Sequence, residues 1–138
     1  MARFAFFVVT TLVLPLIFGP EQAWAGTLSG SWRGGGTLIS GSGTKEKVRC
    51  RVKIKQSSSR TISLTANCAT TSGKANQTMT LRAVSKSKYT GSFHNQEHNA
   101  NGEVVQTTDG KVVLTVRGGR LGMRMVSSRG KATLTLRR

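Results

Sequence analysis

Residues 45–55 read KEKVRCRVKIK, and their alternation is the clearest structural signal in the chain. The odd positions from 47 to 55 are all cationic, and the even positions from 48 to 54 are apolar: the cations are Lys47, Arg49, Arg51, Lys53 and Lys55. A period of two is typical of a β-strand with one buried face and one face in water. The segment therefore predicts a strand that buries Cys50 and exposes a row of positive charge.

A second alternating segment, Thr61–Cys68, follows after a serine-rich stretch and again carries apolar residues at its even positions. A hairpin centred on Ser59 places Cys50 opposite Cys68 and keeps both apolar faces on the same side. A slip of one residue would turn a whole apolar face to water, which strongly favours this register. We therefore expect the two segments to form one hairpin.

The same alternation continues through the chain in short segments separated by turn signals. These segments are Leu28–Trp32, Thr78–Ala83, Tyr89–Phe93, Glu103–Thr107, Val112–Arg117, Leu121–Met125 and Ala132–Arg137, with turn signals that include Ser72-Gly73, Asn101-Gly102, Asp109-Gly110, Gly118-Gly119 and Arg129-Gly130. We expect the glycine cluster Gly34–Gly36 to form a flexible loop or bulge at a rim. About eight short strands without helical periodicity predict an all-β domain.

Two architectures fit an all-β domain of this size: a small antiparallel up-and-down barrel and a β-sandwich. Closure of a barrel removes the exposed edge strands that a sandwich has to protect. Eight strands form a barrel whose interior is filled by side chains or holds one small ligand. We therefore predict the barrel, with the sandwich as the alternative.

The N-terminus has the features of a cleaved signal peptide over residues 1–25. Arg3 precedes an apolar run over residues 4–18, and Ala23-Trp24-Ala25 matches an A-x-A cleavage site. The apolar run is shorter than the roughly 20 residues that span a membrane. We therefore expect a periplasmic or secreted protein with a single domain over residues 26–138 and no transmembrane segment after cleavage.

Export also bears on the two cysteines of the chain. Paired cysteines in a small exported domain most simply form a disulfide. Their spacing fits neither a C-x-x-C redox pair nor a zinc ligand set. We therefore predict one disulfide, Cys50–Cys68.

The charge of the chain is strongly unbalanced. It has 21 Lys and Arg against 5 Asp and Glu, a net charge of +16, and the loss of residues 1–25 leaves that net charge unchanged. Such an imbalance attracts polyanions, and the cationic strand fits an anionic envelope polymer or an acidic protein as partner. Single-stranded nucleic acid usually requires aromatic stacking, and aromatic residues make up only 6% of the chain, so no specific nucleic-acid partner is expected. A surface that only keeps the protein soluble is the remaining possibility, and the oligomeric state stays open.

The triplet Gly30-Ser31-Trp32 resembles the G-x-W that opens the first strand of lipocalin-like and avidin-like barrels. That resemblance implies that Trp32 plugs one end of the barrel and that a basic residue of the last strand packs over it. Arg138 shares the even face of the last strand and is the expected partner for a cation–π contact with Trp32. The resemblance also implies a small-ligand carrier as an alternative function.

Two further resemblances concern the whole domain. The segments Ser29–Gly36, Val48–Val52, Asn67–Ala69, Thr90–Phe93 and Ala132–Arg138 resemble those of a group of small exported proteins of alphaproteobacteria, which implies export and a barrel but no activity. The G-x-W, the single disulfide and the basic C-terminus are also similar to periplasmic inhibitors of secreted metalloproteases. Those inhibitors insert a short N-terminal arm into the protease, and here the arm would be Gly26–Leu28. A protease inhibitor is therefore another alternative.

The segment His94–His98 spells H-x-x-E-H, an inverted zinc-peptidase motif. That chemistry needs a helix and a further ligand, whereas this segment follows a strand and leads to a turn. We expect a polar strand end, with His94 and His98 as a weak candidate pair for a surface metal. Serines are abundant, but the two histidines and few acids offer no base and orienting group for them. We therefore expect a non-catalytic protein without a cofactor.

Overall fold

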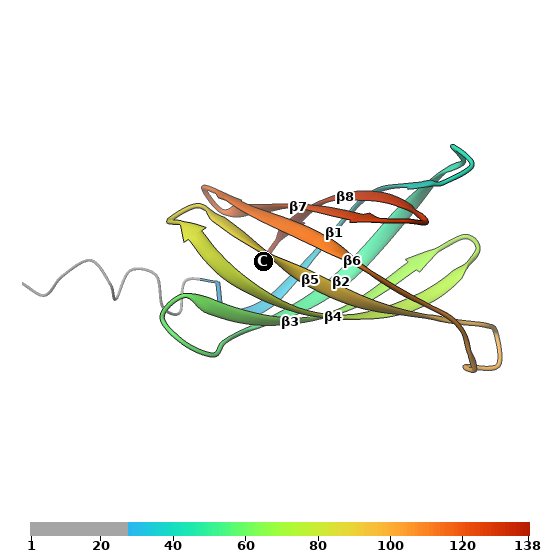
Figure 1. The fold of residues 1–138 in the computed structure, drawn as a ribbon, viewed down its shortest axis with the longest axis horizontal. Helices are drawn as coiled ribbons and strands as arrows, with labels where there is room; N and C mark the ends of the chain where they lie inside the picture. Colours follow the sequence, from blue (N-terminus) through green and yellow to red (C-terminus); the bar gives the residue numbers. More distant parts are fainter. Residues whose placement is uncertain (1–27) are drawn as a thin grey trace, which may run out of the picture.

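The computed structural model describes residues 28–138 and shows the sheet closing on itself, because the last strand pairs with the first (Figure 1). The strands are β1 (Gly30–Ser40), β2 (Lys45–Gln56), β3 (Thr61–Thr70), β4 (Gly73–Ser85), β5 (Lys88–His98), β6 (Val104–Arg117), β7 (Arg120–Ser127) and β8 (Gly130–Arg137). All neighbours are antiparallel and follow chain order. The predicted up-and-down barrel is therefore confirmed, and the sandwich is excluded. The predicted signal peptide lies outside the described residues.

The hairpin of β2 and β3 has the register that the alternation predicts. Cys50 lies opposite Cys68, and Ile54 lies opposite Leu64. The cysteines form a disulfide with 4.1 Å between their Cα atoms, and both face the barrel interior. The predicted disulfide is confirmed.

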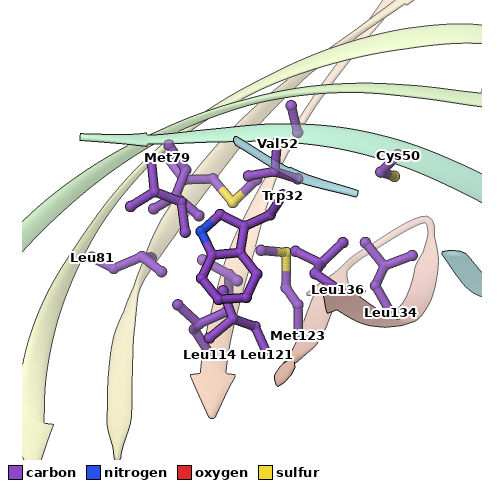
Figure 2. Packing of buried hydrophobic residues seen from close by; sticks show 14 of the residues in the cluster. Trp32, Cys50, Val52, Met79, Leu81, Leu114, Leu121, Met123, Leu134 and Leu136 are labelled. Carbon is purple, nitrogen blue, oxygen red and sulfur yellow. The ribbon is translucent and has the colours of Figure 1, made fainter. Parts of the chain in front are cut away.

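The barrel has two different ends, which we name by their contents. The closed end holds the start of β1, the end of β8 and the β2–β3, β4–β5 and β6–β7 connections; the open end holds the other connections, and the β1–β2, β3–β4 and β5–β6 hairpins project from it (Figure 1). Buried apolar side chains fill the closed end around Trp32, whose Nε1 donates a hydrogen bond to the Leu28 carbonyl at 2.8 Å. Figure 2 shows the indole enclosed by side chains that include Leu81, Leu114 and Leu136.

The glycine cluster Gly34–Gly36 lies within β1, so its prediction as a loop or bulge at the rim was wrong. A Cβ atom on Gly36 would lie 1.7 Å from the carbonyl oxygen of Thr133 on β8, and one on Gly34 would lie 1.9 Å from that of Thr135. The strands β1 and β8 approach too closely here for any side chain. Glycine marks this close backbone approach and not a flexible turn.

Two other boundaries differ from the prediction. The pair Asp109-Gly110 is not a turn, because β6 runs through it without interruption. A Cβ atom on Gly110 would lie 2.3 Å from the carbonyl oxygen of Val126 on β7 and 2.6 Å from the ring of Phe93. This glycine therefore lets a neighbouring strand approach closely and leaves room for a buried aromatic ring. The first strand begins at Gly30 and runs on to Ser40, further than the predicted Leu28–Trp32.

No helix within residues 28–138 is long and apolar enough to cross a membrane.

Candidate anion-binding site

The outer face of strands β1 to β4 has a hollow of about 790 Å³, which we call the cationic groove. Its lining residues are Arg33, Gly34, Gly35, Arg49, Cys50, Arg51, Asn67, Cys68, Ala69, Lys74, Ala75 and Asn76. Four of these side chains are cationic and two are primary amides. The small residues Gly35 and Ala69 stand at outward positions on either side of Arg49 and leave space beside its long side chain.

The register of the sheet brings these residues together. Arg33 on β1 lies opposite Arg51 on β2, which lies opposite Asn67 on β3. In the neighbouring row, Arg49 lies opposite Ala69, which lies opposite Lys74 on β4. Residues from four strands therefore converge on one face, although they are far apart in the sequence.

A second hollow, of about 640 Å³, adjoins the groove on the side of the closed end. It shares Arg33, Arg51 and Asn67 with the groove and adds Lys53 and Arg138. The guanidinium carbon of Arg138 lies 4.6 Å from the centroid of the Trp32 ring, which is the distance range of a cation–π contact. The same guanidinium donates a hydrogen bond to the carbonyl of Ser29 at 3.1 Å.

No carboxylate lines either hollow. Residues 28–138 contain one ion pair, between His94 Nδ1 on β5 and Asp109 Oδ1 on β6 at 2.6 Å. Like charges directly opposite each other on neighbouring strands destabilise a sheet. Arg33 lies opposite Arg51, so the two guanidinium groups repel each other. Solvent ions or an anionic partner would offset this repulsion.

The positive charge continues beyond the groove around the closed end of the barrel. Arg137 lies opposite Arg33, Arg120 lies opposite Arg137, and Arg117 lies opposite Arg120. Together with Arg51 these residues form an arginine row across five adjacent strands, all of them exposed. Neighbouring strands are about 4.8 Å apart, so the row extends over roughly 19 Å of the curved surface.

The cationic residues predicted from β2 have different positions relative to these hollows. Arg49 and Arg51 line the cationic groove, and Lys53 lines the adjoining hollow. Lys47 and Lys55 are exposed on the same strand and line neither. Lys47 and Lys55 therefore contribute to the net charge of the surface without lining either hollow.

The alternating pattern of the sequence did not predict the groove residues of β1 and β4, Arg33 and Lys74. Arg33 directly follows Trp32, so it stands on the outward face once Trp32 is assigned to the interior. The hairpin register around Gly41-Ser42-Gly43 would then have placed Arg33 opposite Arg51. Because Gly34–Gly36 were predicted to form a loop, the first strand was predicted to end before them. The pairing of Arg33 with Arg51 could therefore not be predicted.

The structure does not bring the two histidines together. His94 and His98 lie four residues apart on β5, which separates them by roughly 13 Å along the strand. His94 pairs with Asp109, and His98 Nε2 lies 3.3 Å from Asn76 Nδ2. Across the described part of the chain, no three His, Cys, Asp or Glu residues gather as metal ligands would.

The interior of the barrel is hollowed at the open end. This open-end cavity has a volume of about 460 Å³ and adjoins a smaller one of about 270 Å³. Val48, Met125 and Leu134 contribute apolar walls to the larger cavity, and Glu46 and Glu97 contribute carboxylates. The barrel therefore offers a basic groove on its outer face and a cavity with two carboxylates inside, and Lys74 lines both.

Comparison with known proteins gives a fold and no family. No protein-family model matches the sequence, and no curated protein matches it. The structure is similar to a redesigned β-barrel, mFAP1, bound to DFHBI, with a TM-score of 0.62 and 14% identity over 86% of this chain and 97% of that one. It is also similar to a de novo designed fluorescence-activating β-barrel, with a TM-score of 0.56 and 18% identity over 88% of this chain and 99% of that one. A third similar structure is EF1p2_mFAP2b bound to DFHBI, with a TM-score of 0.62 and 11% identity over 86% of this chain and 98% of that one. The protein thus has the fold of small eight-stranded antiparallel barrels.

Proposed function

We propose that this protein is a non-catalytic, exported barrel that binds an anionic polymer of the cell envelope through the cationic groove. The observation that supports this function is the convergence of Arg33, Arg49, Arg51 and Lys74 on one hollow without a carboxylate. Guanidinium groups bind phosphate and carboxylate with two parallel hydrogen bonds, which makes arginine well suited to such a site. The arginine row extends the positive surface beyond the groove, and this favours a polymer over a single small anion.

The partner chemistry that fits best is a polymer that carries phosphate monoesters. An acidic polypeptide is the other candidate, because its carboxylates also accept bidentate hydrogen bonds from arginine. The two differ in charge density, since a phosphate monoester carries up to two charges on three accepting oxygens. A direct comparison of purified lipopolysaccharide with polyglutamate distinguishes them.

The test is the salt dependence of binding by residues 26–138. A partner held by about four cations releases about four counterions, so its affinity is expected to fall roughly a hundredfold between about 50 and about 200 mM salt. Fluorescence anisotropy with labelled lipopolysaccharide measures this dependence. Binding that is absent, or that does not change with salt, would refute the proposed function.

A small-ligand carrier is the second candidate function, and the open-end cavity is the observation that favours it. Pockets of about 300–1,000 Å³ with apolar walls and a few polar groups are typical of small-molecule sites. Two of the solved barrels with this fold hold DFHBI. Carriage inside the barrel is compatible with a polyanion on its outer face, because the groove and the cavity lie on opposite faces of the sheet, although Lys74 lines both.

The protease-inhibitor alternative has less support. The predicted arm Gly26–Leu28 lies outside the described residues except for its last residue. Leu28 is buried in the core, and its carbonyl accepts the hydrogen bond from the Trp32 indole. A residue held in this way is part of the barrel and not of a free arm.

A further inference from the structure

The open-end cavity carries acidic side chains, whose charge is opposite in sign to the net charge of the molecule. Only five of the 138 residues are Asp or Glu, and two of them, Glu46 and Glu97, line this cavity. Glu46 accepts a hydrogen bond from the hydroxyl of Ser72. Neither carboxylate has a cation within ion-pair distance among residues 28–138. The interior therefore presents negative charge inside a strongly basic protein.

The cations near the cavity do not cancel this charge. Lys74 and His98 line its rim, and Lys74 also lines the cationic groove on the outer face. Arg129 and Lys131 line the smaller adjoining cavity. Lys74, Arg129 and Lys131 are exposed to water, where their field is screened within about 8 Å at physiological salt. Glu46 and Glu97 are half-buried, and their field is screened less than that of fully exposed side chains.

A second observation independently points to a ligand with hydrogen-bond donors. The side chain of Asn95 on β5 is only 8% exposed and lines both cavities, and its Oδ1 has no hydrogen-bond partner within the described chain. The Oγ1 of Thr108, which lines the smaller cavity, is likewise buried without a partner there. Burial of an acceptor without a partner is costly. A donor that enters the cavity would remove this cost.

We propose that the open-end cavity binds a small molecule that carries a protonated amine on an apolar body. The ammonium group meets Glu46 or Glu97 and donates to the Oδ1 of Asn95, and the apolar body packs against Val48 and Met125. This inference rests on the proposed role as a small-ligand carrier and names the chemical class of the ligand. It does not require polyanion binding at the outer face.

The experiment compares two fluorescent probes on residues 26–138. Dansylcadaverine carries a primary amine, and its N-acetylated derivative keeps the dansyl group but has no charge. The increase of dansyl fluorescence on transfer into an apolar cavity reports binding of either probe. A hydrogen-bonded charge contributes about a tenfold difference in affinity, so the amine is expected to bind about ten times more tightly than the acetylated probe.

Matched variants locate the effect. Glu97→Gln keeps the shape of the side chain and removes its charge, and we expect a loss of about tenfold for the amine and no change for the acetylated probe. Asp109→Asn makes the same change in net charge at an outward position on β6 and is expected to leave both affinities unchanged. Glu46→Gln serves as a second interior variant if Glu97→Gln does not fold.

Two outcomes contradict the inference, and they are distinguishable. Equal binding of both probes to the unaltered protein would overturn the amine preference and leave the carrier role standing. Absence of binding by either probe would overturn both. The comparison of probes on the unaltered protein does not depend on the folding of any variant.

Discussion

Glycine at positions 34 and 36 lets β1 and β8 lie closer together than any side chain permits. The carbonyl oxygens of Thr135 and Thr133 occupy the places that their Cβ atoms would take. Gly35 marks a close approach on the other side of β1, because a Cβ atom there would lie 2.6 Å from the carbonyl oxygen of Val48 on β2. It also stands at an outward position and leaves space beside Arg49 in the cationic groove. Single residues thus set both the closure of the barrel and the shape of its candidate site.

Gly36→Ala tests the close approach directly. The added methyl group would lie 1.7 Å from a backbone oxygen, and either β1 or β8 has to move. We expect a loss of about 2 kcal/mol or more in the free energy of unfolding, measured by urea denaturation. Gly119→Ala is the control, because nothing lies within 4 Å of its Cβ position and a change within about 0.5 kcal/mol is expected there. Equal stability of the two variants would show that β1 and β8 are not in close contact.

The buried phenol of Tyr89 makes stability depend on alkaline pH. Burial raises the pKa of Tyr89 above its usual value of 10.0, because desolvation disfavours the phenolate. The folded protein then holds this proton more tightly than the unfolded chain does. Its contribution to stability is therefore unchanged below pH 10.0 and is lost as the pH rises above that value.

Tyr89→Phe isolates this effect from the titration of the lysines. We expect the stability of the unaltered protein to fall relative to Tyr89→Phe as the pH rises from neutral to above 10.0, in thermal denaturation monitored by circular dichroism. Parallel pH profiles of the two proteins would contradict a raised pKa at this position.

The β2–β3 hairpin shows what alternation alone can predict at the level of elements. The alternation in the two strands and the positions of their cysteines predict the same register, and the structure has that register. The predicted turn at Asp109-Gly110 was wrong because glycine also occurs within a strand where a neighbouring backbone or ring needs space, here the carbonyl of Val126 and one buried ring. Phe93 on β5 is that ring, and its contact with Gly110 depends on a pairing that is not visible locally.

The disulfide is expected to contribute much of the stability of this hairpin. It joins cysteines 18 residues apart, and loop-closure entropy predicts a contribution of about 3 kcal/mol. Replacement of Cys50 and Cys68 by alanine should therefore lower the free energy of unfolding by about that amount in urea denaturation. The reduced form of the unaltered protein is the control and should show a similar loss. A double variant as stable as the oxidised protein would show that the bond constrains little.

At the scale of the whole molecule, the pairing of β1 to β4 brings the residues of the candidate site together, and closure of the sheet extends its positive charge. The alternation predicted the exposed cations of β2, but the groove also needs Arg33 from β1 and Lys74 from β4. Their convergence follows from the pairing of four strands, and the arginine row also needs β8 beside β1. The volume of the open-end cavity could not be predicted either, because it depends on how the inward side chains fill the barrel.

The barrel also separates its charges. Cations cover its outer face, whereas Glu46 and Glu97 line the cavity at the open end. The net charge of +16 therefore describes the outer surface and not the interior. For this reason a test of function has to distinguish a localised site from the general attraction of a basic protein for anions.

The most direct test compares two double variants that change the same strand and the same net charge. Arg49→Gln with Arg51→Gln removes two cations of the cationic groove, and Lys47→Gln with Lys55→Gln removes two cations that line neither hollow. With labelled lipopolysaccharide at fixed salt, we expect the groove variant to lose about tenfold or more in affinity. The variant of Lys47 and Lys55 is expected to lose about twofold, as screened surface charges do. Equal losses in the two variants would contradict a groove-localised site and leave only non-specific attraction by the net charge.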